Sequence, residues 1–428
     1  MNINLLKLDP VSRRVFVERL AKTTLGVTVL PMALRAEDEV KPDNSKLPGF
    51  GKAKNVIWLQ MIGGMSHIDT LDPKAGETKG PGDPITTKAG YQLGGYLPKL
   101  AENQSGKVTI IRSMSSKTGV HADGQYIMRT GYEKRGTIQH PNLGAWAQNI
   151  LGVSNKSLPS SVCINRRSDH GNGFLSSAFS PLPILDPDSG LQYAKMEAEP
   201  DLVQKRLTLL NKLDSGFRAK FQDVNLKSYT DFYDDTLKLL SSEDLKVFKL
   251  DEEPEALREL YGSNKFGQGC LLARRLVEKG VRFVEVSHGS WDMHNDIDDG
   301  MEEHGTTLDT GISALLGDLE ARGLLASTMV VLCSEFGRTP KINSRSGRDH
   351  YPKVFSTLLA GGGVKGGFIY GSSDKEGAEV ADKQVSIQDF HSIIGHAMGM
   401  NVDQVVTAPN GRPFTVGDKG KVITDVFA

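Results

Sequence analysis

The chain has 428 residues, of which 38% are hydrophobic and 24% are charged, the composition of an ordinary globular protein. Its 51 Lys and Arg residues balance 52 Asp and Glu residues, so there is no basic excess and no nucleic-acid partner is expected. The three cysteines are odd in number and far apart, unlike a disulfide framework or a CxxC zinc site.

The first 36 residues have the order of a twin-arginine signal peptide. Arg13 and Arg14 stand in the run SRRVF, a moderately apolar stretch follows at 20–34, and the segment ends near Ala36. A basic, an apolar and a small-residue region in that order are typical of a signal peptide, and the arginine pair indicates the twin-arginine route. We expect a periplasmic or secreted protein with no transmembrane segment in the mature chain, because this stretch is short and polar. An ordinary N-terminal helix is the alternative.

A polar linker at 37–52 precedes a regular pattern that begins at residue 53. Short apolar runs predict strands at 55–61, 108–111, 161–164, 282–287, 328–333 and 354–359. Helices are expected at 121–130, 142–150, 267–279, 306–321 and 387–398. This alternation predicts an α/β domain at 53–428 with a mostly parallel central sheet and helices on both faces. Leu-spaced, charged residues at 199–262 predict a helical insertion.

Candidate metal ligands follow two of these strands. Asp292 and His294 come after 282–287, Glu335 comes just after 328–333, and His350 ends the loop beyond it. In open α/β sheets, ligands bind at the carboxyl ends of the strands. Carboxylate and imidazole are common metal ligands, so these four residues are predicted to hold a divalent ion, whether zinc, manganese, calcium or magnesium. Alternatively, they cap helices and turns and pair with one another.

Other polar residues could contact a substrate. The glycine-rich turn at Gly64 exposes backbone N–H groups that suit an anion, although a tight turn explains the glycines equally well. Ser66 in the same turn is a candidate nucleophile. Arg338 could bind phosphate or sulfate bidentately, or pair with local acids. His121 stands at a predicted helix start, a second position that favours negative groups.

Together these segments resemble the DUF1501 family, a bacterial family of exported proteins without an assigned function. The resemblance runs from the signal peptide to about residue 400 and is carried by RRVF, NVIWLQMIGGMSHIDTLDPK, SWDMH, SEFGRTPKIN with GRDHYPKVF, and LAGGGVKGG. The family is similar to the alkaline phosphatase and sulfatase superfamily, which implies a metal site at the carboxyl edge of the sheet. Glu335 then falls where a metal-binding Asp is expected, and Asp292, His294 and His350 fall at further ligand positions.

Three positions depart from the superfamily pattern. The first strand ends at Met61 and two glycines follow, where a metal-binding Asp is expected. His121 occupies the place of the nucleophile, and Phe336 stands where a second ligand often lies. There are therefore too few ligands for two metal ions, whereas a site for one metal ion remains plausible.

The resemblance implies an exported, metal-dependent hydrolase of phosphate or sulfate esters. Its substrate would be a small anionic ester or a sulfated or phosphorylated polymer. His121 would be the nucleophile or general acid/base, Ser66 the reserve nucleophile, and Arg338 with Gly64 the anion-binding group. A non-catalytic binding or assembly protein that keeps the fold with a degenerate metal site is the alternative.

Overall fold

The computed structural model describes residues 44–167, 171–192 and 238–428, together with isolated positions between 202 and 215. The predicted signal peptide at 1–36 and part of the predicted insertion at 199–262 lie outside the described residues. Within the insertion, the structure shows two 3-10 helices, Glu243–Phe248 and Leu250–Glu252, and the helix α6, Glu255–Tyr261. Among the described residues, no helix is long and apolar enough to cross a membrane.

A nine-stranded sheet forms the centre of the described domain, in the order β12-β4-β11-β8-β1-β7-β5-β6 with β15 beside β4. Its strands are β1 (Asn55–Met61), β4 (Val108–Ser115), β5 (Ser161–Ile164), β6 (Leu182–Ile184), β7 (Phe283–His288), β8 (Thr328–Ser334), β11 (Phe355–Ala360), β12 (Phe368–Tyr370) and β15 (Val385–Ser386). Only β11 runs antiparallel to its neighbours within this sheet. The prediction of a mostly parallel sheet is confirmed.

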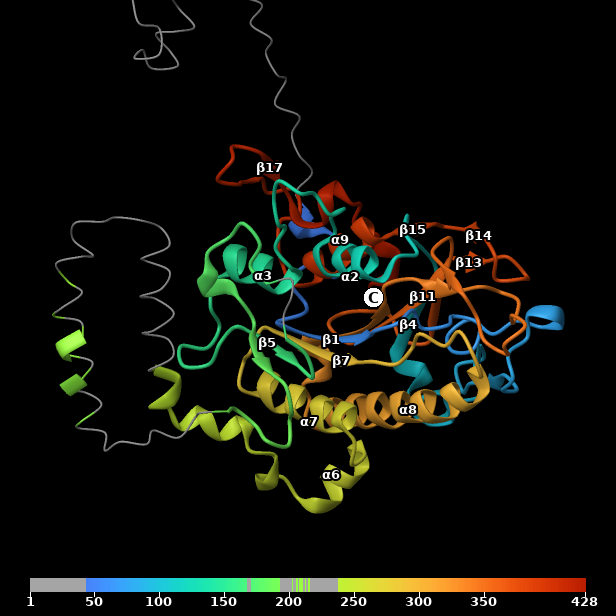
Figure 1. The fold of residues 1–428 in the computed structure, drawn as a ribbon, viewed down its shortest axis with the longest axis horizontal. Helices are drawn as coiled ribbons and strands as arrows, with labels where there is room; N and C mark the ends of the chain where they lie inside the picture. Colours follow the sequence, from blue (N-terminus) through green and yellow to red (C-terminus); the bar gives the residue numbers. More distant parts are fainter. Residues whose placement is uncertain are drawn as a thin grey trace, which may run out of the picture. The chain divides into compact units, whose positions relative to one another are not determined.

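Helices cover both faces of the sheet (Figure 1). One face carries α7 (Lys265–Glu278) and α8 (Ile297–Ala321), and the other carries α2 (His121–Thr130), α3 (Leu143–Leu151) and α9 (Ile387–Ala397). The central strand β1 is buried along its whole length because it contributes to both cores. Ile57 and Leu59 pack with the α7–α8 face, and Val56 and Trp58 pack with the opposite face, as the two-residue repeat of a strand requires.

Several features of the fold differ from expectation, among them the unpredicted strands β6, β12 and β15 of the central sheet. Helix α8 begins at Ile297, nine residues before the predicted start at 306. The early turns were missed because they contain acids and glycines and only a few buried residues, such as Met301. Short strand pairs were not predicted: β2 (Ile85–Thr86) with β3 (Gln92–Leu93), β9 (Gly337–Arg338) with β10 (His350–Tyr351), β13 (Ser372–Ser373) with β14 (Val380–Asp382), and β16 (Val406–Thr407) with β17 (Pro413–Phe414). Strands of two or three residues are too short to show a sequence periodicity.

A buried ion pair ties α2 to the sheet. Arg129, in the last turn of α2, donates from Nε and Nη2 to Glu285 Oε1 on β7, at 2.9 and 2.7 Å. Both side chains are less than 10% exposed. The pair fixes the orientation of a helix whose first residue is His121, so it links the core to the carboxyl edge of the sheet.

We expect Arg129→Ala to lower the free energy of unfolding by about 3–5 kcal/mol, because it leaves the Glu285 carboxylate buried without its partner. Chemical denaturation measures the loss. The matched control is Lys117→Ala, which removes an exposed ion pair with Glu133 and should cost less than about 1 kcal/mol. Equal losses in the two variants would contradict this account.

Candidate metal centre

The carboxyl ends of three neighbouring strands meet at one place on the sheet edge. In the parallel register, Met61 at the end of β1 pairs with His288 on β7 and with Ser334 on β8. The loops that follow these strands therefore leave the sheet side by side, and they carry Gly63, Asp292 and Glu335. Helix α2 reaches the same edge with its first residue, because His121 contacts Glu335.

Three side chains could hold a metal ion together. His121, Asp292 and His350 each offer a ligand atom, and these atoms lie within 4.8 Å of one another. His121 Nε2 is 3.3 Å from Asp292 Oδ2, and His350 Nε2 is 3.0 Å from Asp292 Oδ1. His294 adds a fourth donor, since its Nε2 lies 3.1 Å from Asp292 Oδ1. The structure thus brings together three of the four predicted ligands and adds His121.

The other nitrogen of each imidazole is held by an oxygen that can only accept. His121 Nδ1 donates to Glu335 Oε1 (2.8 Å), His294 Nδ1 to Asp349 Oδ1 (2.7 Å) and His350 Nδ1 to the carbonyl of Gly119 (2.8 Å). In a neutral imidazole, the Nδ1 proton leaves a lone pair on Nε2. All three Nε2 atoms face Asp292, and each can bind a metal ion in the neutral ring or carry a proton in the charged ring. A second bond of this kind orients metal-bound histidines in proteins.

The Nε2 atoms of the three histidines are placed where they could bind a cation. His294 Nε2 and His350 Nε2 are 3.0 Å apart, and in neutral rings both are acceptors, so nothing but a proton or a metal ion can join them. His121 Nε2 is buried and has no hydrogen-bond partner among the described residues. Ligands on a tetrahedral zinc ion with bonds of 2.0–2.1 Å lie roughly 3.3 Å apart, which matches these separations. The donor set fits one divalent ion.

The local charges favour an ionised Asp292 and a proton on His121. Partial burial alone would raise the pKa of Asp292, but hydrogen bonds from Arg338 and His350 outweigh it and lower this pKa to about 2. The hydrogen bond to Glu335 raises the pKa of His121 above its ordinary value, although burial opposes it. A metal ion would compete with this proton for Nε2.

Glu335, predicted as a metal ligand, lies behind His121 in the structure. It is fully buried, and its Oε1 accepts from His121 Nδ1 and, at 2.9 Å, from the backbone N–H of Gly63. Gln125 also donates to this oxygen, at 3.4 Å. In this arrangement, Glu335 fixes the ring of His121 and does not face the other donors.

Arg338 and Gly64, predicted to bind an anion, contact each other. Arg338 is 1% exposed, and its Nε donates to the carbonyl of Gly64 at 2.8 Å. Its other donors reach the carbonyls of Gly63 and Arg348 and the carboxylate of Asp292. The guanidinium is therefore occupied by the protein and orients Asp292.

Ser66, the predicted reserve nucleophile, faces a buried polar network. It is 3% exposed, and its hydroxyl contacts Asp69. Asp69 Oδ2 in turn accepts from Arg348 Nε at 2.8 Å. This network holds the loop after β1 against the loop before β10.

The sequence did not predict the supporting roles of two residues, Phe336 and Asp349. Phe336 packs its ring against His121 and His350, with ring centroids 5.0 and 4.9 Å away, so it is a wall of the site. Asp349 orients His294 from the position next to His350. A carboxylate beside a candidate ligand is a weak sequence signal, and only the side-chain directions show which residue it serves.

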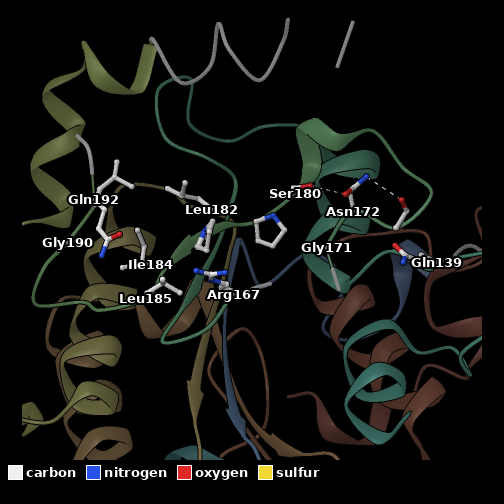
Figure 2. Close-up of a pocket in the computed structure, with 14 residues that line it drawn as sticks. Gln139, Arg167, Gly171, Asn172, Ser180, Leu182, Ile184, Leu185, Gly190 and Gln192 are labelled. Carbon is white, nitrogen blue, oxygen red and sulfur yellow. Dashed lines mark hydrogen bonds between the residues drawn. The ribbon is translucent and has the colours of Figure 1, made fainter. Parts of the chain in front are cut away.

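A separate cleft of ≈ 600 Å³ lies along the edge strand β6 (Figure 2). Its lining combines amide and arginine side chains, including Gln139, Arg167 and Asn172, with apolar residues such as Leu182 and Leu185. None of the histidines or carboxylates of the metal centre lines it. The neighbouring residue Arg166 contacts Gln125 on α2, so the segment that borders this cleft also approaches the metal centre.

These features define an α/β protein with a histidine–carboxylate centre at the carboxyl edge of a mostly parallel sheet. The chain belongs to the family described as "Protein of unknown function (DUF1501)", which it matches over residues 53–427. The predicted family is therefore confirmed. No curated protein matches the chain.

Similar solved structures include sulfatases and alkaline phosphatases. The PsFucS1 sulfatase from Pseudoalteromonas sp. is 12% identical with a TM-score of 0.41, over 98% of this chain and 76% of its own. The lipoteichoic acid synthase LtaP from Listeria monocytogenes is 10% identical with a TM-score of 0.37, over 85% and 78%. The alkaline phosphatase from the Antarctic bacterium TAB5 is 12% identical with a TM-score of 0.32, over 76% and 95%.

We expect Glu335→Gln to lower the pKa of His121 relative to the unchanged protein, because the variant removes the carboxylate that holds its proton. Histidine NMR titration of the metal-free protein measures the shift. Since the folded-state pKa of His121 is raised above 6.5, its contribution to stability is complete below pH 6.5 and is lost as the pH rises through the folded-state value. Glu335→Gln should weaken this pH dependence, and an unchanged titration would show that Glu335 does not act on His121.

Proposed function

We propose that the protein is a metal-dependent hydrolase of phosphate or sulfate esters, exported by the twin-arginine route. The observation that carries the proposal is the convergence of three imidazole Nε2 atoms on the ionised carboxylate of Asp292, each ring held from behind. Other buried histidines, such as His67 and His391, also have a ring nitrogen without a partner among the described residues, but His121 and His350 place theirs around a shared carboxylate. The carboxyl edge of a mostly parallel sheet, where this centre lies, is also where α/β proteins bind their ligands.

The chain's own residues would hold and orient one ion. His121, Asp292 and His350 would bind it, with His294 as a fourth donor, and Arg338 would keep Asp292 in place. Once bound, a divalent ion lowers the pKa of a bound water and stabilises the negative charge that develops on an ester oxygen. The four side chains are 27–44% exposed, which leaves one side of the centre open to a substrate. His121 acts here as a ligand and not as the nucleophile.

Arg166 is our candidate for the group that binds the substrate's anion, in place of Arg338. It is half-buried, and its Nη1 donates to Gln125 Oε1 at 2.9 Å. Gln125 is four residues after His121 on α2, so the two side chains share one face of the helix. Through Gln125, the guanidinium is linked to the helix that begins at His121, and we propose that it binds a small anionic ester, or one group of a sulfated or phosphorylated polymer.

A non-catalytic binding or assembly protein is the second candidate. The observation in its favour is that β1 supplies no carboxylate, because Gly63 occupies the position and donates its N–H to Glu335. A single ion without a second metal could then stabilise the loops at the sheet edge. Both candidate functions predict a bound metal ion, but only the hydrolase predicts turnover of an ester.

We expect the purified mature protein to contain about one divalent ion per chain and to hydrolyse nitrophenyl phosphate or nitrophenyl sulfate. His350→Ala should remove the ion and lower kcat/KM by more than about 100-fold, beyond the loss typical of residues that only orient a ligand. His304→Gln, which changes a histidine on α8 outside the donor set, should keep the ion. Elemental analysis measures the metal content, and an ester screen with zinc, manganese, calcium and magnesium measures the turnover. Bound metal with no turnover would support the second candidate.

We expect Arg166→Ala to raise KM for the anionic ester by about 10- to 100-fold with a smaller change in kcat, because it removes a charge-assisted hydrogen bond to the bound substrate. Steady-state kinetics separate the two constants. The matched control is Arg167→Ala, which removes the neighbouring, exposed guanidinium at the β6 cleft and should leave KM unchanged (Figure 2). The same KM for both variants would refute the role of Arg166.

A further inference from the structure

We propose that Asn343 is a positioning residue that sets the affinity of the metal centre by holding Asp349 against His294. The inference rests on the proposed metal site and adds a residue that touches none of the reacting atoms. Asn343 lies in the loop between β9 and β10, seven residues before His350. Its side chain joins this loop to the loop that carries Asp292 and His294.

The amide of Asn343 has one possible orientation. Its Oδ1 accepts from the backbone N–H groups of Arg345 and Gly347, at 2.9 and 3.0 Å. Its Nδ2 faces the carbonyl of His294 at 3.1 Å and Asp349 Oδ1 at 3.4 Å. Because the first two partners are donors and the last two are acceptors, a flipped amide would lose all four contacts. The direction of the donor toward Asp349 is therefore fixed.

The two loops are joined closely around this amide. Backbone N–H groups of Asp296 and Ile297 donate to the carbonyls of Arg345 and Ser346, at 3.1 and 2.8 Å. Gly347 packs so tightly on His294 that a Cβ there would lie 2.1 Å from the His294 carbonyl carbon. The chain turns back on itself between Asn343 and Gly347, where the N–H of Asn343 donates to the carbonyl of Gly347 at 2.8 Å. This turn brings Gly347 into contact with His294.

Backbone strain marks the same junction. Ser346 has a φ of 60° and Asp296 has a φ of 42°, both in the left-handed region, and the two segments pair through Asn295 and Ser346. Non-glycine residues in this region are strained and persist only where the surroundings hold them. The contacts of Asn343 help to hold the conformation that places His294 beside His350.

Asp349 needs such support because it is exposed. Its side chain is 50% exposed, and its Oδ1 accepts from His294 Nδ1 at 2.7 Å. A carboxylate in water rotates easily, and an exposed contact of this kind is weak alone. Asn343 donates to the same oxygen and so limits the rotation. The ring of His294 then keeps its Nε2 pointed at Asp292 and His350.

The test is Asn343→Asp in the mature protein. The new carboxylate keeps the acceptor for Arg345 and Gly347, but it replaces the donor with an oxygen that repels Asp349 and the His294 carbonyl. We expect the dissociation constant for Zn²⁺, measured by competition with a chelator, to rise by about 10- to 100-fold, as for other residues that orient metal ligands. Ser344→Ala, an exposed change in the same loop, should leave it unchanged.

A second measurement separates positioning from general damage to the fold. In the metal-free protein, the His294 Nδ1 proton should give a resolved NMR signal that is lost in Asn343→Asp and kept in Ser344→Ala. An unchanged Zn²⁺ affinity in Asn343→Asp would overturn the inference while leaving the proposed hydrolase intact. Weakened Zn²⁺ binding without ester turnover in any variant would support the inference and refute the hydrolase. A starting protein that binds no Zn²⁺ would overturn both.

Discussion

The buried guanidinium of Arg338 is the interaction on which the arrangement of the site depends. It lies between three loops and donates to the carbonyls of Gly63, Gly64, Trp291 and Arg348 and to the carboxylate of Asp292. An arginine 1% exposed is tolerated only when its donors are filled, because an unpaired buried charge costs several kcal/mol. The loops after β1 and β7 and the loop before β10 must therefore converge on one point. This convergence sets Asp292 beside His121, His294 and His350.

The sequence predicts the central elements of the fold because they are buried on both sides. The run at Asn55–Met61 is apolar at nearly every position, and α2 ends where Gly131 adopts a φ of 77°. Both signals are local. The antiparallel direction of β11 and the early start of α8 are not predicted, because they depend on pairing and packing between residues far apart in the chain. Propensity alone does not determine such choices.

The sequence locates the site better than it assigns the roles within it. Parallel strands with successive polar ends bring Asp292, His294, Glu335 and His350 to one edge, which spacing can predict. The direction of each side chain cannot be predicted in this way. The structure turns Glu335 toward the outer nitrogen of His121, and it fills the donors of Arg338 with carbonyl groups. The distinction between a ligand and its supporting residue depends on contacts across more than 200 residues of chain.

Gly63, His121 and Phe336 are linked to one another in space through Glu335 and the ring of His121. A side chain at Gly63 would place its Cβ 2.4 Å from the backbone nitrogen of Asp292, so β1 cannot present a carboxylate there. The Gly63 N–H instead binds Glu335, which holds His121. Phe336 covers the space behind His121 and His350 with an apolar ring that restricts both imidazoles. Gly63 and Phe336 thus help to orient the side chains around Asp292, and this donor set could hold one ion.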